Sequence, residues 1–116
     1  MHPVRKWIVL AIALTACGGD DGGPSLPTVD CSPPVPTFSQ VRAFNTNCTM
    51  CHALALPYEA RSGAPVGMDY DVYASAVAVG DATASTVFQM TMPPSGGLFP
   101  ADKEALYKWT LCGMPQ

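Results

Sequence analysis

Apolar side chains recur at helical spacing in four segments of this chain, and stretches rich in Gly, Pro and polar residues separate these segments. Four residues lie three or four positions apart in the first segment: Phe38, Val41, Phe44 and Cys48. This spacing is typical of one buried face of an α-helix. Thr37 and Gln40, three residues apart, have the pattern of a capping box and predict that the helix begins there.

Two shorter helices and a loop are predicted for the middle of the chain. Pro and Gly recur in the segment 53–68 and break any long element there. Asp69 is a candidate N-cap for a helix that runs to Val77, and Asp81 is a candidate N-cap for one that runs to Met90. The aromatic and aliphatic side chains of these helices are expected to pack in the core.

A last helix is predicted within residues 98–109. Its first turn contains Asp102 and Glu104, and its last turn contains Lys108, which is the distribution that the helix dipole favours. Gly113 follows as a natural C-terminal stop. All the elements that the pattern predicts are therefore helices.

Residues 1–16 have the pattern of an export signal. Arg5 and Lys6 precede a short apolar run, 7–14, which is too short to span a bilayer as a stable helix. The run ends in Leu-Thr-Ala-Cys, which resembles a bacterial lipobox whose last residue is Cys17. The resemblance implies cleavage before Cys17 and lipidation of this residue, and several acyl chains would give stable anchoring. The alternative is an ordinary secretory signal with an incidental cysteine.

Residues 17–36 are predicted to form a tether. Gly and Asp dominate its first part, and such a composition cannot bury a core. Prolines at positions 33, 34 and 36 stiffen its far end. Fully extended, the tether could reach about 60 Å at about 3.1 Å per residue, enough to let a domain move off a membrane. The remaining residues, 37–116, suit one small domain.

Removal of the signal would make the chain more acidic. The full sequence has a formal net charge of −3 at pH 7. Cleavage before Cys17 would remove Arg5 and Lys6, which leaves four basic side chains against nine carboxylates and a net charge of −5. An acidic surface argues against binding nucleic acid, and against binding anionic lipid by charge. It suits a partner with a basic docking patch.

The most specific motif lies at residues 48–52, which read Cys-Thr-Met-Cys-His. C-x-x-C-H is the attachment signature of a c-type haem. Cys48 and Cys51 lie about one helical turn apart and can form thioether bonds to the two vinyl groups of the porphyrin, while His52 supplies the proximal iron ligand. Two alternatives are a thioredoxin-like redox pair and half of a zinc site. Zinc needs four ligands, and one histidine remains after residue 16.

The sixth iron ligand can be a methionine, a lysine, a rarer group or nothing, and a methionine is predicted. Bis-His ligation is excluded because His52 is the one histidine beyond the signal. Met92 is the stronger candidate, because the two prolines after it stop a helix and keep the chain extended. Met90 is the alternative. Side chains two residues apart on an extended chain point opposite ways, so Met90 and Met92 should not both reach the iron.

Taken together, these motifs resemble a class I monohaem cytochrome c domain of the bacterial lipoprotein type. The resemblance rests on C-x-x-C-H at 48–52, Met-Pro-Pro at 92–94, the Trp-containing helix at 101–109 and Gly-Met-Pro at 113–115. It implies an all-α fold with little or no sheet, in which a small helical bundle surrounds one covalently bound haem c. The first and last helices of such a domain cross beside the haem.

The resemblance also implies a function. We expect a membrane-tethered, periplasm-facing electron carrier that cycles between Fe(III) and Fe(II) with His/Met ligation. Two tight axial ligands leave no site for a substrate, so we do not expect an enzyme. One alternative is a five-coordinate haem sensor or peroxidase-like protein, which requires that Met92 does not bind. The other is a haem-free lipoprotein whose C-x-x-C pair exchanges disulfides.

Partners and location follow from the same expectations. The chain should meet a redox protein as donor or acceptor, contact a lipid bilayer through Cys17, bind no nucleic acid and remain monomeric. Its location would be a Gram-negative-type cell envelope. The inner and the outer membrane both stay open, and Gly18 after the lipidated cysteine favours the outer one.

Two cysteines are not general to that family. The sequence has five cysteines, and Cys17, Cys48 and Cys51 already have predicted roles. Cys31 and Cys112 remain, and in an oxidising compartment we expect them to form a disulfide. Closing a loop of about 80 residues would contribute about 4 kcal/mol in the chain-entropy model. Two free thiols are the alternative.

Overall fold

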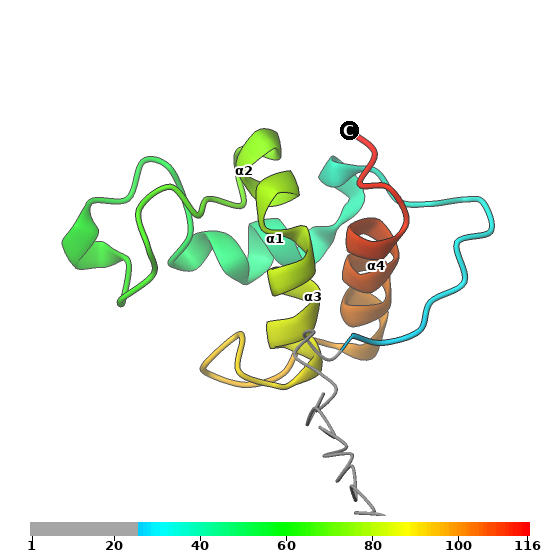
Figure 1. Ribbon diagram of the computed structural model, residues 1–116. Coiled ribbons are helices and arrows are strands. Elements are labelled where there is room, and N and C mark those ends of the chain that lie inside the picture. Colours follow the sequence, from blue (N-terminus) through cyan, green and yellow to red (C-terminus); the bar gives the residue numbers. More distant parts are fainter. Residues whose placement is uncertain (1–25) are drawn as a thin grey trace, which may run out of the picture.

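Helices connected by loops make up residues 26–116, the part of the chain that the computed structural model describes (Figure 1). The regular elements are η1 (Phe38–Gln40), α1 (Arg42–Thr46), η2 (Cys48–Met50), η3 (Tyr58–Ala60), α2 (Tyr73–Ala78), α3 (Gly80–Phe88) and α4 (Pro100–Leu111), where η marks a 3-10 helix. This range contains no β-strand, so the predicted all-α class is confirmed. No helix within it is long and apolar enough to cross a bilayer.

Some of the predictions fall on residues that the structure does not describe. The export signal at 1–16, the lipidation site Cys17 and the first part of the tether, up to residue 25, lie outside the described residues. They stay predictions.

The first predicted helix is divided into three short pieces. It begins where the capping box places it, because the side-chain carbonyl of Gln40 accepts a hydrogen bond from the backbone N–H of Thr37 at 2.9 Å. Val41 then leaves the helical conformation, with ψ at 88°, while its side chain is fully buried. Asn47 interrupts the chain again, so Cys48 begins a separate 3-10 turn.

Neither aspartate predicted to cap the middle helices does so. The N-cap of α2 is Val72 and the N-cap of α3 is Val79. Asp69 is buried and forms an ion pair with Arg61, so its carboxylate is not available to a helix end. Asp81 lies within the first turn of α3, where the helix dipole still favours a carboxylate.

The last helix lies two residues further along the chain than the predicted segment, at Pro100–Leu111. Asp102 lies in the first turn of α4 and Lys108 in the last, as predicted, whereas Glu104 lies beyond the first turn. Gly113 follows with a φ of 98°, a conformation that glycine adopts without steric cost. The N–H of Met114 donates to the carbonyl of Trp109 at 3.0 Å, which completes a Schellman-type C-terminus.

An aromatic cluster joins the start of the domain to α4. Phe44 of α1 packs edge-on against Trp109 with ring centroids 5.2 Å apart, and Phe38 contacts the same indole at 5.7 Å. The indole N–H donates to the carbonyl of Pro115 at 2.8 Å, so this fully buried ring leaves no unpaired donor. Arg42 and Asp102 add an ion pair at 3.1 Å between the same two helices.

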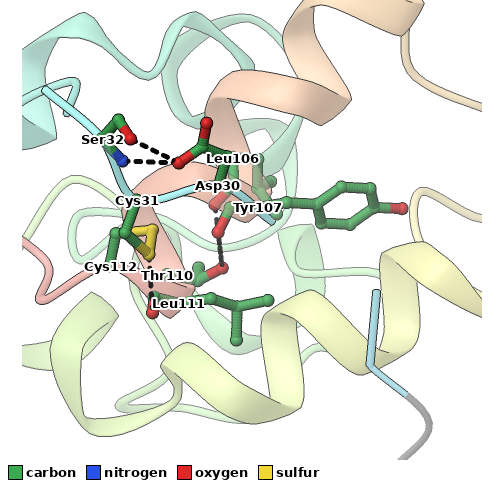
Figure 2. The surroundings of a disulfide bond; sticks show 8 residues. All are labelled: Asp30, Cys31, Ser32, Leu106, Tyr107, Thr110, Leu111 and Cys112. Atoms are coloured by element: carbon green, nitrogen blue, oxygen red, sulfur yellow. Dashed lines mark hydrogen bonds between the residues drawn. A yellow bond between two sulfur atoms is a disulfide. The ribbon is translucent and has the colours of Figure 1, made fainter. Parts of the chain in front are cut away.

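A disulfide connects the far part of the tether to the end of α4. Cys31 and Cys112 are bonded, with their Cα atoms 5.4 Å apart and a separation of 81 positions in sequence (Figure 2). Figure 2 also shows Asp30 accepting two hydrogen bonds from Ser32, and these bonds lower the pKa of the Asp30 carboxyl. The segment 28–30 lies beside α4, and both line a shallow groove.

Candidate functional site

One cleft brings together the four residues with predicted roles in haem binding. It encloses about 760 Å³ of empty space, part of it open to solvent, and Cys48, Cys51, His52 and Met92 all line it. The first three come from η2 and the residues directly after it, and Met92 comes from the loop after α3. Segments about 40 residues apart in sequence therefore meet at one site.

His52 is held with one ring nitrogen bonded and the other free. Its Nδ1 lies 2.9 Å from the backbone oxygen of Met68, and its side chain is largely buried. Because a carbonyl oxygen can only accept, Nδ1 carries a proton, and in the neutral imidazole Nε2 then has the lone pair. Nε2 has no hydrogen-bond partner among the described residues. This arrangement is similar to that of metal-ligating histidines, which commonly donate their other N–H to a carbonyl.

Tyr70 supports the imidazole and forms part of the cleft wall. The rings of His52 and Tyr70 pack edge to face at 5.2 Å, and the N–H of Tyr70 donates to the carbonyl of His52 at 2.8 Å. The Tyr70 hydroxyl is 2.6 Å from the hydroxyl of Thr83 on α3. Burial raises the pKa of the Tyr70 phenol, which therefore stays neutral at physiological pH.

Sequence reasoning did not identify Arg61. Its side chain is bonded to several groups of the loop 53–69, which supports His52. Its side chain is 2% exposed and pairs with Asp69 at 2.8 Å. Its guanidinium also donates to the carbonyls of Ala53 and Pro65, both at 2.7 Å, and contacts that of Met68 at 3.3 Å. An arginine among Pro and Gly residues, with an aspartate eight positions later, is the pattern that could have indicated a buried pair.

Neither thiol of the C-x-x-C motif is in a disulfide in the described part of the chain. Cys48 and Cys51 are both half-buried, and the carbonyl of Cys48 accepts from the N–H of His52 at 2.8 Å, which closes one helical turn. Burial raises the pKa of the Cys48 thiol to about 12. A reactive redox cysteine requires the opposite shift, because the thiolate is the nucleophile.

The five methionines beyond the signal occupy different environments. Met92 is 41% exposed and lines the cleft, whereas Met90 is 74% exposed and does not. Met50 is exposed, and Met68 contributes its backbone carbonyl to His52. Met114 packs against the core, close to Gly80. Lining of the cleft therefore favours Met92 over Met90, and the assignment of the ligand stays a prediction.

The residues of the cleft fit a covalently attached haem. They offer two thiols one turn apart, an imidazole with a free Nε2 and a thioether, with mostly apolar walls that include Val87 and Leu98. Apolar walls suit a porphyrin, and the sulfur and nitrogen donors suit its iron. Within residues 26–116, no three His, Cys, Asp or Glu side chains are grouped to hold a metal ion by themselves.

Comparisons of this chain with models of known protein families, with curated proteins and with solved structures give no match. The chemistry of the site is therefore argued from its own residues.

Proposed function

We propose that this protein is a single-haem electron carrier, exported and tethered to a membrane through Cys17. The observation that carries the proposal is the convergence in one cleft of both thiols of C-x-x-C-H, its histidine and Met92. When bound, haem c supplies an iron that accepts or donates one electron by cycling between Fe(III) and Fe(II).

Each residue has one role in this proposal. Cys48 and Cys51 would hold the haem through thioether bonds, and His52 would bind its iron through Nε2. The carbonyl of Met68 fixes the orientation and the tautomer of that imidazole. Met92 would bind the iron through its sulfur. His/Met ligation would raise the reduction potential relative to bis-His ligation and leave no position for a substrate.

One observation favours a second candidate function. Met92 lies in the loop 89–99, whose residues Met90 and Phe99 are 74% and 72% exposed, so few buried contacts hold this loop against the cleft. If Met92 leaves the iron, the protein becomes a five-coordinate haem sensor or a peroxidase-like protein. The haem-free thiol-disulfide alternative has less support, because the high pKa of Cys48 disfavours a thiolate.

A haem stain of the exported protein on a denaturing gel tests the proposal directly, because only covalently attached haem survives denaturation. We expect a stained band of mature size. Colourless protein in which both Cys48 and Cys51 can be alkylated would refute the proposal. A ferric absorption spectrum then separates the two haem functions, since an iron–methionine bond gives a weak far-red band that a five-coordinate site lacks.

The membrane tether requires a separate test. We expect Cys17→Ala to abolish labelling of the protein by a radioactive fatty acid and to release the haem protein from the membrane fraction. The conservative control is Cys31→Ala, which leaves the lipobox pattern unchanged. Unchanged membrane association of Cys17→Ala would refute the lipid anchor and leave the electron-carrier proposal intact.

A further inference from the structure

We propose that Arg61 is a positioning residue for His52, and that the Arg61–Asp69 ion pair sets the reduction potential of the haem. This inference rests on the proposed function, and it concerns two residues that the C-x-x-C-H motif does not contain. Both side chains are almost completely buried, 2% and 4% exposed, and they are 2.8 Å apart.

Arg61 fixes the two ends of the loop that supports the imidazole. Its Nη1 donates to the carbonyl of Ala53, the residue directly after His52, at 2.7 Å. Its Nη2 contacts the carbonyl of Met68, the group that accepts the Nδ1 proton of His52, at 3.3 Å. One guanidinium therefore holds both the backbone next to the histidine and the acceptor of its ring proton.

The shared Met68 carbonyl couples the charge of Arg61 to the basicity of His52. A carbonyl oxygen has two lone pairs, and here one faces the Nδ1–H and another the guanidinium. A cation polarises that oxygen toward itself and weakens it as an acceptor for the imidazole N–H. The imidazole is then a weaker donor to iron, which favours Fe(II) over Fe(III).

The direct electrostatic effect has the same sign. Fe(III) carries one more positive charge than Fe(II), so a buried cation nearby favours Fe(II), and a buried anion favours Fe(III). Arg61 and Asp69 compensate each other in the intact pair. Neutralising the arginine leaves the carboxylate of Asp69 uncompensated, and neutralising the aspartate leaves the guanidinium of Arg61 uncompensated.

This balance makes opposite predictions for the two members of the pair. Arg61→Gln should lower the reduction potential, Asp69→Asn should raise it, and the double variant should return toward the wild-type value. The amide introduced by Asp69→Asn keeps an oxygen that can accept from Arg61, so this variant retains the hydrogen bond while losing the charge. If the ion pair only held the loop in place, both single variants would shift the reduction potential in the same direction, because both weaken the contact between Arg61 and Asp69.

Arg61→Lys separates positioning from charge. It keeps the positive charge but loses the forked set of donors that reaches several carbonyls at once. We expect a reduction potential close to that of the wild type, together with faster solvent exchange of the His52 Nδ1 proton, measured by NMR on the reduced protein. If Arg61→Gln does not fold, Arg61→Lys and Asp69→Asn still test the inference.

The experiment measures the potentials of the purified haem proteins by spectroelectrochemistry. The matched control is Asp102→Asn, because Asp102 forms an ion pair with Arg42 and does not line the cleft. It should leave the potential unchanged. Shifts of the same sign in Arg61→Gln and Asp69→Asn, or no shift beyond that of the control, would overturn this inference while the haem stain still supports the proposed function. A wild-type protein without haem would overturn both.

Discussion

The two loops that line the cleft are held to very different degrees. The loop 53–69, below His52, is fixed by the buried guanidinium of Arg61 and its partner Asp69. The loop 89–99, which carries Met92, has no buried ion pair with the described residues. The N–H groups of Thr91 and Met92 donate to the carbonyl of Thr86, and Leu98 is buried, but Met90, Met92 and Phe99 are exposed.

The difference indicates that one side of the cleft is rigid and the other can move. The ring of His52 and the backbone next to it are both held by hydrogen bonds, so this side chain keeps its orientation without a bound cofactor. A ligand on an exposed loop with few buried contacts belongs to the part of a protein that opens locally at low free-energy cost. In the proposed haem protein, we therefore expect the iron–His52 bond to be permanent and the iron–Met92 bond to be the one that breaks and re-forms.

The largest expected effect comes from removing both attachment thiols. The double variant Cys48→Ala/Cys51→Ala should lose all covalent haem, because no thioether can form. Met50→Ala is the matched control, since Met50 lies between the two cysteines and is 72% exposed. A haem stain of both proteins checks the prediction, and a stained band for the double variant would contradict it.

Breaking the Arg61–Asp69 pair should destabilise the domain strongly. Removal of one partner of a buried ion pair typically costs about 3–5 kcal/mol, because the other charge stays buried without compensation. We expect Arg61→Gln to lower the free energy of unfolding by this amount in a denaturant titration. Arg42→Gln is the comparison variant. Arg42 is 65% exposed and its partner Asp102 is 11% exposed, so water reaches one side of this pair and the loss of stability should be smaller than for Arg61→Gln. Equal effects would show that the loop 53–69 is not held as described.

The disulfide should stabilise the domain without affecting the cleft. Cys31→Ala/Cys112→Ala opens a connection across 81 residues, and we expect a loss of about 2–4 kcal/mol in the free energy of unfolding. The haem stain and the reduction potential should stay as in the wild type, because neither cysteine lines the cleft. A changed potential would mean that the end of α4 and the haem are coupled.

The smallest expected change is spectroscopic and comes from the exposed loop 89–99. Met92→Ala should abolish the far-red ferric band, because it removes the sulfur proposed to bind the iron. Met90→Ala should retain the band. Loss of the band in Met90→Ala and its retention in Met92→Ala would exchange the two assignments and move the adjustable ligand two residues along the loop.

Local patterns predicted the ends of the domain well. The capping box at Thr37 and Gln40 and the stop at Gly113 were both found where the sequence places them. These features depend on bonds between residues a few positions apart, so the sequence contains the information. The caps at Asp69 and Asp81 were wrong. Asp69 pairs with Arg61 instead, and α3 begins after Val79, two residues before Asp81.

The sequence by itself determined the chemistry that this protein can offer: two thiols and an imidazole in a fixed local spacing, and a methionine followed by two prolines. Only the tertiary structure decided which of these groups share a cleft, which carbonyl orients His52, and that Arg61 lies buried beneath it. The physical reason is that every residue has a backbone carbonyl, so the residue types do not show which carbonyl will accept from His52. The folded backbone decides which carbonyl lies within reach.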